Sequence, residues 1–231
     1  MENLTLIWNS LPALLRGMLV TLELTLAFLG LGFIVGIVIA FGQVYGNKFT
    51  RTVISSYERV FRAIPALVLL FLFYFGSAFI GINLSAFISA CLAMGLRSSA
   101  YQSQIFRGAI QSVGKEQMMA SRSIGMSQIQ SIIYVILPQI LRLSIPSWTN
   151  EFAIVLKDTS LVYALGITEM LRQGRYIIAR TYGNSLLIYM TAAVIYFILV
   201  FAGSKLFGFL EDKFRIPGYE TKEEKEGVRA V

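Results

Sequence analysis

The sequence LTLAFLGLGFIVGIVIAFG, residues 24–42, decides the fold class, because it contains no charged residue. A helix rises 1.5 Å per residue, so a helix of this length crosses a hydrocarbon core of about 30 Å. Two further runs have the same character: residues 63–82 carry no charge, and residues 184–210 carry only Lys205, near their end. These three runs predict an all-α integral membrane protein.

The composition agrees with a membrane protein and excludes several classes of site. The 231 residues are 56% hydrophobic and 14% charged, with a mean hydropathy of +0.67, whereas soluble domains carry about 25% charged residues. The chain has no histidine and one cysteine, Cys91, which excludes histidine-based triads, internal disulfides and cysteine-based zinc sites. The net charge of +7 comes from scattered basic residues, without the pattern of a nucleic-acid-binding module. The chain is therefore not expected to be an enzyme.

Two weaker runs complete the set of predicted spans. Residues 84–106 are apolar until Arg97 and polar afterwards, and residues 129–156 contain Pro138, Pro146 and Glu151. Proline and charge survive at membrane depth only where neighbours or water satisfy them. We therefore expect these two spans to face protein rather than lipid, which gives five spans in total.

Basic residues in the connections predict the orientation. If the N-terminus lies outside, eleven lysines and arginines fall on the inner side and five on the outer side, with four arginines unassigned. This bias favours an N-out, C-in chain. The spans are then joined by a short inner loop (residues 43–56), an outer turn (76–83), a polar inner connection (108–128) and a partly helical outer segment (157–183).

The chain divides into three parts. Residues 1–17 predict an extracytoplasmic or interfacial helix with Trp8 at headgroup level, the alternative being a disordered N-terminus. Residues 18–210 form the transmembrane domain, and residues 211–231 form a charged cytoplasmic tail.

The inner connection has a layout of its own. Residues 115–124 predict a short helix, and Gly125 falls where a helix end needs a left-handed residue. Ser127, with Gln130 three residues later, is a capping-box pattern that opens the next helix. The short helix carries apolar residues that suit a partner's groove, or else the surface of the bilayer: Met118, Met119, Ile124 and Met126.

The stretch from residue 117 to residue 138 resembles the signature of permease subunits of bacterial and archaeal ABC importers. That pattern is Glu-Ala-Ala, three residues, Gly, nine residues, Ile, one residue, Leu-Pro. This chain has Met119-Ala120-Ser121, then Gly125, Val135 and Leu137-Pro138 at the same spacing. Met119 replaces the glutamate of the pattern, so we expect a weaker or more apolar contact there.

Other stretches resemble the polar amino-acid branch of these importers. They are FRAIP (61–65), IFRGAI (105–110), VILPQILR (135–142) and residues 150–161, which end in LKDTSL. The resemblance covers roughly residues 11–210.

The resemblance implies the type I importer permease (MetI-like) architecture. Two such subunits, identical or different, pair in the cytoplasmic membrane, an extracytoplasmic binding protein delivers the amino acid, and the inner loop docks on cytoplasmic ATPase subunits. The chain has no Gly-x-x-x-x-Gly-Lys-[Ser/Thr] loop, so ATP and Mg would belong to the partner. The implied docking residues are Lys115, Glu116, Met119, Ala120, Ser121, Arg122, Ser123, Gly125 and Met126.

Arg97 follows an apolar run and so lies near the middle of the bilayer. An unpaired charge there costs about 2.5–3.5 kcal/mol on insertion scales. One interpretation is that Arg97 pairs permanently with Glu151 or Glu23 and fixes the bundle. The other is that Arg97 holds the carboxylate of an amino acid bidentately while Glu151 meets the ammonium group.

Further polar and apolar residues extend this candidate pathway. The complete predicted set is Arg97, Glu151, Asn150, Ser98, Tyr101, Leu67 and Met94. In the resembled family a small polar residue usually stands in place of Arg97, so this arginine suggests a carboxylate-rich substrate. Asp158 or Thr159 is expected to cap a following helix over residues 161–165.

The sequence thus favours a permease subunit that moves polar amino acids by alternating access, driven by a separate ATPase. Two alternatives stay open. The first is an ion- or proton-coupled secondary transporter that uses Arg97 and Glu151 as its coupled pair, although five spans without an inverted repeat are not typical of that class. The second is a non-transporting assembly or sensor subunit.

Overall fold

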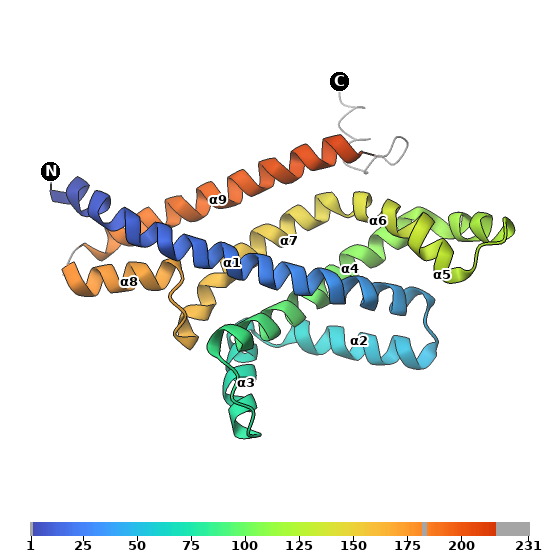
Figure 1. The fold of residues 1–231 in the computed structure, drawn as a ribbon, viewed down its shortest axis with the longest axis horizontal. Coiled ribbons are helices and arrows are strands. Elements are labelled where there is room, and N and C mark those ends of the chain that lie inside the picture. The colour runs from blue at the N-terminus through green and yellow to red at the C-terminus, as the bar shows by residue number, and fades with distance from the viewer. Residues whose placement is uncertain (1, 182–183, 216–231) are drawn as a thin grey trace.

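The computed structural model describes residues 2–181 and 184–215, and every regular element in these ranges is a helix (Figure 1). Helix α1 (Glu2–Tyr45) contains the charge-free run 24–42 and is continuous with the predicted N-terminal helix, which forms its first turns. Helix α9 (Ser185–Phe214) confirms the last predicted span and begins at Asn184, whose side chain accepts from two backbone N–H groups.

The region after α1 differs from the predicted inner loop. Helix α2 (Lys48–Ala63) begins at Asn47, whose Oδ1 accepts a 2.8 Å hydrogen bond from the Thr50 N–H and caps the helix. The predicted connection over residues 43–56 is thus mostly helical, because the side-chain cap at Asn47 starts a helix there. Only Gly46 and Asn47 connect α1 to α2.

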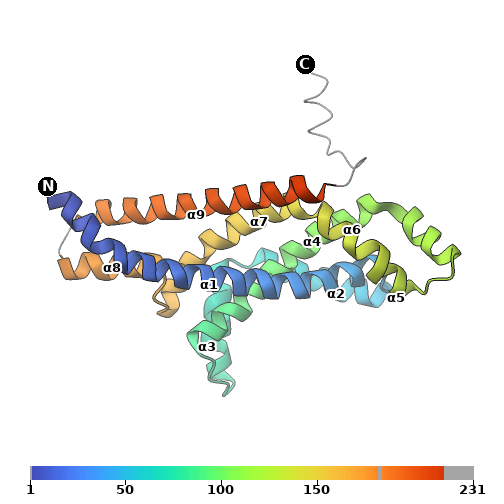
Figure 2. The same cartoon turned by 45° about the horizontal axis from the view of Figure 1, so that its top comes forward.

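The second predicted span is bent rather than straight. Ile64 precedes Pro65 and is extended (φ −79°, ψ 131°), as expected for a residue before proline. The chain resumes as α3 (Ala66–Phe79), which turns 105° from α2 and projects from the bundle (Figures 1 and 2).

Helix α4 (Ala86–Ser123) contains the third predicted span and continues into the inner connection, with a break at Gly114, where φ is +79°. Its polar residues are buried, which agrees with a span that faces protein: Ser98, Ser99, Gln102 and Ser103. Gly32 of α1 permits the close crossing, because a Cβ there would lie 2.9 Å from the Ser98 Oγ.

The fourth predicted span consists of several segments. After α5 (Gln128–Gln130) comes a π-helical turn, η1 (Ser131–Ile136), in which the Leu137 N–H bonds five residues back to Ile132. Pro138, which has no N–H, follows at the start of α6 (Leu137–Leu143). The missing donor accounts for the change from hydrogen bonds four residues back to hydrogen bonds five residues back.

The rest of this span is bent as well. Helix α7 (Ile145–Asp158) follows after a bend of 60°. The outer segment then forms the 3-10 helix η2 (Thr159–Leu165) and helix α8 (Met170–Thr181).

Length and hydropathy define two of the described helices as able to span a membrane, Leu4–Tyr45 and Ser185–Phe214, or up to four spans if each bent pair counts as one. Figure 1 shows α1, α4 and α9 running in one direction along the molecule and α2 and α7 running back. Helix α3, which contains most of the second predicted span, points away from these five helices, and the count of five spans and the orientation stay predictions. Of the predicted tail, residues 211–214 belong to α9 and residues 216–231 lie outside the described residues.

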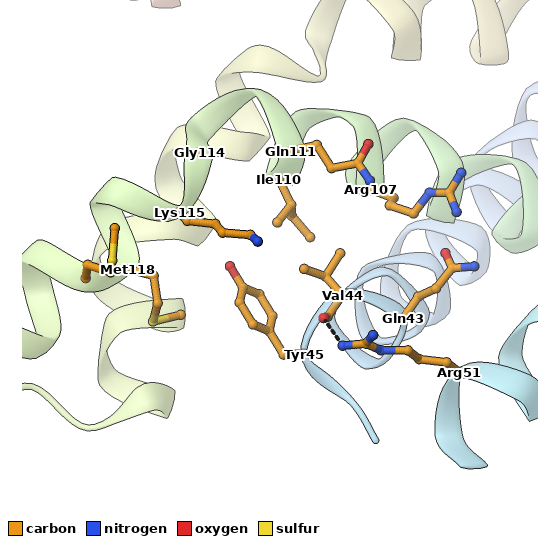
Figure 3. Close-up of a pocket in the computed structure, with 11 residues that line it drawn as sticks. Gln43, Val44, Tyr45, Arg51, Arg107, Ile110, Gln111, Gly114, Lys115 and Met118 are labelled. Atoms are coloured by element: carbon orange, nitrogen blue, oxygen red, sulfur yellow. Dashed lines mark hydrogen bonds between the residues drawn. The ribbon is translucent and has the colours of Figure 1, made fainter. Parts of the chain in front are cut away.

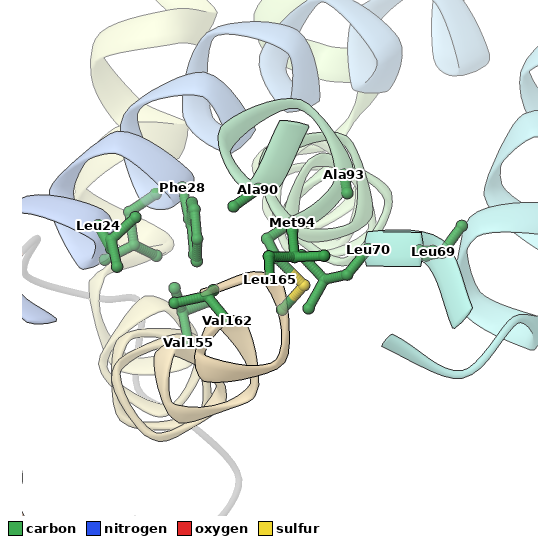
Figure 4. Packing of buried hydrophobic residues seen from close by; sticks show 11 residues of the cluster. Leu24, Phe28, Leu69, Leu70, Ala90, Ala93, Met94, Val155, Val162 and Leu165 are labelled. Carbon is green, nitrogen blue, oxygen red and sulfur yellow. The ribbon is translucent and has the colours of Figure 1, made fainter. Parts of the chain in front are cut away.

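The largest hydrophobic cluster lies between α1, α3, α4, α7 and η2 (Figure 4). Leu24 and Phe28 of α1 lie on one side of the cluster, near Val162 of η2, and Leu70 of α3 and Met94 of α4 lie on the other. The cluster joins the projecting helix α3 to the bundle.

Candidate functional site

An ion pair joins α4 to the end of α7. The Arg97 Nη1 donates a 2.9 Å hydrogen bond to the Asp158 Oδ2, and the two side chains are 19% and 26% exposed. The predicted partners of Arg97, Glu151 and Glu23, were therefore wrong. The reason is geometric: Asp158 lies seven residues after Glu151, two turns along the same face of α7, and its carboxylate meets the guanidinium.

Glu151 has a different partner from the one predicted. It is 5% exposed, and its Oε1 accepts a 2.7 Å hydrogen bond from the Ser98 Oγ. Two neighbouring residues of α4 thus reach two carboxylates of α7, Arg97 to Asp158 and Ser98 to Glu151. The expected cap by Asp158 or Thr159 is absent, because Asp158 is engaged with Arg97 and the Thr159 hydroxyl donates to the Leu156 carbonyl at 2.7 Å.

A chain of hydrogen bonds continues from Ser98 across the bundle. The Gln102 Nε2 donates to the Ser98 Oγ at 3.1 Å and to the Leu29 carbonyl at 3.2 Å. The Trp148 Nε1 donates to the Gln102 Oε1 at 2.7 Å. Gln102 is fully buried, so it ties α1, α4 and α7 together and holds Ser98 against Glu151.

Arg97 keeps unused hydrogen-bonding capacity. Its Nε is buried and has no hydrogen-bond partner among the described residues. The Tyr101 ring lies 5.0 Å from the Arg97 Cζ and orients the guanidinium. The Arg97 Nε is therefore a buried donor without a partner, on a guanidinium that pairs with Asp158 and follows directly before the serine bonded to Glu151.

The remaining predicted pathway residues are not all brought to this pair. Met94 is 3% exposed and packs within the large hydrophobic cluster (Figure 4). Leu67, 38% exposed, lies in the first turn of α3, and Asn150 is exposed on α7. Met94 thus contributes to the core of this chain.

The sequence interpretation missed Asp158 and Arg62 as parts of the site. The Arg62 Cζ lies 5.1 Å from the centre of the Tyr101 ring, which Arg97 also contacts. The seven-residue spacing from Glu151 could have indicated Asp158. No local signal links Arg62 of α2 to Tyr101 of α4, because that contact forms only when the two helices pack.

The inner connection forms the predicted helix, turn and helix. The Met126 N–H bonds to the Ser121 carbonyl at 3.2 Å and the Gly125 N–H bonds to the Arg122 carbonyl at 3.0 Å, which together make a Schellman motif. Gly125 has φ +93°, and a reciprocal capping box joins Ser127 and Gln130. The predictions for these residues are confirmed.

The predicted docking residues are mostly accessible. Met119 is 59% exposed and Ile124 is 78% exposed. The charged and small members are exposed as well: Lys115, Glu116, Ala120, Arg122, Ser123 and Gly125. Met126 is half-buried, and Ser121 is 5% exposed, with its hydroxyl donating to the Met118 carbonyl. Ser121 is therefore a buried support of this helix–turn–helix around Gly125, called the elbow below.

Comparison with known proteins gives the class. The chain belongs to the family of binding-protein-dependent transport system inner membrane components, whose model matches residues 32–216. It is thus a multi-pass protein of the cytoplasmic membrane and an ABC-transporter permease, which confirms the resemblance in residues 117–138.

Its similar proteins are amino-acid permeases. The chain is 32% identical to the glutamine transport system permease protein GlnP of Escherichia coli (strain K12), covering 91% of this chain and 96% of that protein. It is 36% identical to the L-cystine transport system permease protein TcyB of Bacillus subtilis (strain 168), covering 82% and 81%. It is 32% identical to the nopaline transport system permease protein NocM of Agrobacterium fabrum, covering 88% of each.

Two solved structures support the fold. The crystal structure of an amino acid ABC transporter with histidines has a TM-score of 0.80 at 34% identity, covering 90% of this chain and 96% of that one. An inward-facing MetNI methionine ABC transporter has a TM-score of 0.66 at 20% identity, covering 88% and 97%. The second likeness shows the fold alone and supports the type I importer architecture.

Proposed function

We propose that this chain is the permease subunit of an ATP-driven importer of polar amino acids, with five spans, N-out and C-in. The observation that carries the proposal is the course of α4. This element holds Arg97 in its first part, before the break at Gly114, and the exposed segment 115–123 after that break. The 17 residues from Arg97 to Gly114 span about 26 Å at 1.5 Å per residue. Movement of the segment 115–123 would therefore reach the Arg97 pair through the Gly114 break and the first part of α4.

The inner segment serves as the docking element for a separate ATPase subunit that binds ATP and Mg. Met119 and Ile124 are large, exposed and apolar on a rigidly capped elbow, which suits a hydrophobic groove on a partner. Met119 replaces the glutamate of the family pattern, so this contact gains apolar area and loses an ionic component. The Gly114 break gives the elbow a hinge within α4.

The paired charges serve as the substrate site. The unpaired Arg97 Nε would take the amino-acid carboxylate, and Glu151 and Asp158 would take the ammonium group. Relatives named for glutamine and L-cystine transport support an amino acid as the substrate. Alternating access then requires the Arg97–Asp158 pair to open and re-form as the transporter switches states.

The partners follow from this mechanism. A second permease subunit, identical or different, would complete the pore, and an extracytoplasmic binding protein would deliver the amino acid. The direct test is uptake of radiolabelled glutamine, glutamate and arginine by proteoliposomes that hold the full complex, with the binding protein outside and ATP inside. Uptake that depends on the ATPase and on the binding protein supports the proposal. Uptake driven by an ion gradient without the ATPase would overturn it in favour of a secondary transporter.

A further inference from the structure

Arginines line a polar cavity between α2 and α4. This cavity of about 480 Å³ is bordered by Arg59 and Arg62 of α2 and by Arg107 of α4, together with Tyr101 and Gln104. Arg62 stacks on the Tyr101 ring that Arg97 also contacts. The cavity therefore begins beside the paired charges described above.

One acid lies in this wall, but it is already engaged. Glu58 is 5% exposed and accepts hydrogen bonds from the Gln43 Nε2 at 2.9 Å and from the Ser103 Oγ at 2.7 Å. Arg62 and Arg107 form no ion pair with any residue of 2–181 or 184–215. Three guanidinium groups thus face one carboxylate that is held by neutral donors.

A second cavity continues toward the inner end of the molecule. It has a volume of about 600 Å³, shares Gln43 and Arg107 with the first, and adds Arg51 and Lys115 to the lining (Figure 3). Figure 3 shows the Lys115 ammonium extending toward Tyr45 across the space. No acidic residue is among those that line this second cavity.

The two cavities adjoin at Gln43 and Arg107, and together their lining carries five basic side chains and one acid, Glu58, beside apolar residues such as Val44 and Ile110. The polar stripe of α4 follows helical spacing along this face: Arg97, Tyr101, Gln104, Arg107 and Gln111. Arg62 is exposed and has no ion-pair partner among the described residues, so its guanidinium is open to water or to an anion. Walls of one sign raise the local concentration of the opposite ion, and arginine and lysine linings serve anion pathways.

We propose that this α2–α4 face is an electropositive vestibule through which an amino acid with an additional side-chain carboxylate passes from the Arg97 site to the inner side. The inference rests on the proposed function and narrows its substrate class to acidic amino acids. In this vestibule Arg62 receives the side-chain carboxylate beside Tyr101, and Arg107 passes it to the wider inner cavity.

The test compares uptake of glutamate and glutamine, which differ at the side-chain carboxylate alone. Proteoliposomes with the complete transporter are made with the wild-type chain, with the double variant Arg62→Gln/Arg107→Gln, and with Arg142→Gln as a control. Arg142 is an exposed arginine of α6 outside the two cavities. We expect the wild-type chain to take up glutamate and the double variant to do so at about a tenfold lower maximal rate. Any uptake of glutamine by the double variant should change by less than twofold, and so should uptake of glutamate by the Arg142→Gln control.

Three results would count against the inference, and each is distinguishable. Wild-type uptake of glutamine or arginine without glutamate would overturn the vestibule and leave the proposed function standing. The double variant could instead lower the uptake of every amino acid equally, and the wild-type chain could show the same fall in vesicles without phosphatidylglycerol. That result would assign the arginines to lipid headgroups and overturn the vestibule too. Absence of all ATP-dependent amino-acid uptake would instead remove the proposed function itself.

Discussion

The elbow around Gly125 and the Arg97–Asp158 charge pair form in opposite ways. The elbow around Gly125 is made by contacts between residues at most five apart, namely a Schellman motif and a capping box. The Arg97–Asp158 pair joins residues 61 positions apart, and it exists only because α4 and α7 pack together. The elbow should therefore tolerate changes in the bundle, while the pair should respond to every change in helix packing.

The largest effect is expected from removing the charge of Arg97. In Arg97→Ala, substrate-stimulated ATPase activity of the complex should fall by at least about 30-fold, since truncating one partner of a hydrogen-bonded charge pair costs about 2–5 kcal/mol. The complex should still assemble, as seen by co-purification of the permease with the ATPase subunit. The control is Arg97→Gln/Asp158→Asn, which removes both charges and should assemble equally well without regaining activity. Failure of Arg97→Ala to assemble would make the pair a structural anchor instead.

A smaller effect is expected at the hydrogen-bond chain behind the site. Trp148→Phe leaves the buried Gln102 Oε1 without its donor, and an unsatisfied buried group costs about 1–3 kcal/mol. Trp8→Phe is the matched control, because Trp8 is 76% exposed and a surface change stays within about 0.5 kcal/mol. Thermal unfolding in detergent should show a lower Tm for the first variant alone. Equal Tm values for the two variants would mean that the hydrogen-bond chain through Gln102 does not stabilise the site.

At the elbow, two glycine-to-alanine changes separate the effect of a left-handed backbone from the effect of losing a glycine. Gly125→Ala places a side chain at φ +93°, which costs about 1–2 kcal/mol, although space around it is open. Gly108→Ala, also in open space but within helix α4, should be neutral or stabilising by up to about 1 kcal/mol. The first variant should lower the ratio of stimulated to basal ATPase activity more than the second. The same ratio in both would remove the elbow from the coupling mechanism.

The smallest effect concerns the capping box. Ser127→Ala removes the side-chain acceptor of the Gln130 N–H and should destabilise the start of the next helix by about 1 kcal/mol. Ser123→Ala, which removes a hydroxyl bonded within its own helix, is the control and should stay within about 0.5 kcal/mol. Hydrogen exchange of residues 127–131 reads this locally. Unchanged exchange in Ser127→Ala would show that the cap adds nothing to the elbow.

These two regions also mark what the sequence could predict. Gly125, Ser127 and Gln130 were placed correctly because left-handed glycine and capping boxes are local properties of the chain. The charge-free run at 24–42 and the run at 184–210, which carries only Lys205, likewise predicted helices, since hydrophobic length is readable without tertiary structure.

Predictions that depended on packing were the ones that needed correction. Arg97 was expected to pair with Glu151 or Glu23, but the packing of α4 against α7 pairs it with Asp158, and Glu151 accepts from Ser98. The connection expected over residues 43–56 contains the start of α2, which one asparagine side chain, Asn47, caps. Arg62 was left unassigned, since only the packing of α2 against α4 brings it to Tyr101.

The most direct test asks which side of the membrane the elbow occupies and what covers it. In a Cys91→Ser background, Ser123→Cys is treated with a membrane-impermeant maleimide in inside-out and right-side-out vesicles, with Arg175→Cys on α8 as the outer control. The account predicts that Ser123→Cys is labelled only in inside-out vesicles and is protected when the ATPase subunit is bound, while Arg175→Cys shows the opposite sidedness. Labelling of Ser123→Cys from the outside, or labelling that the ATPase does not reduce, would contradict a permease driven through this segment.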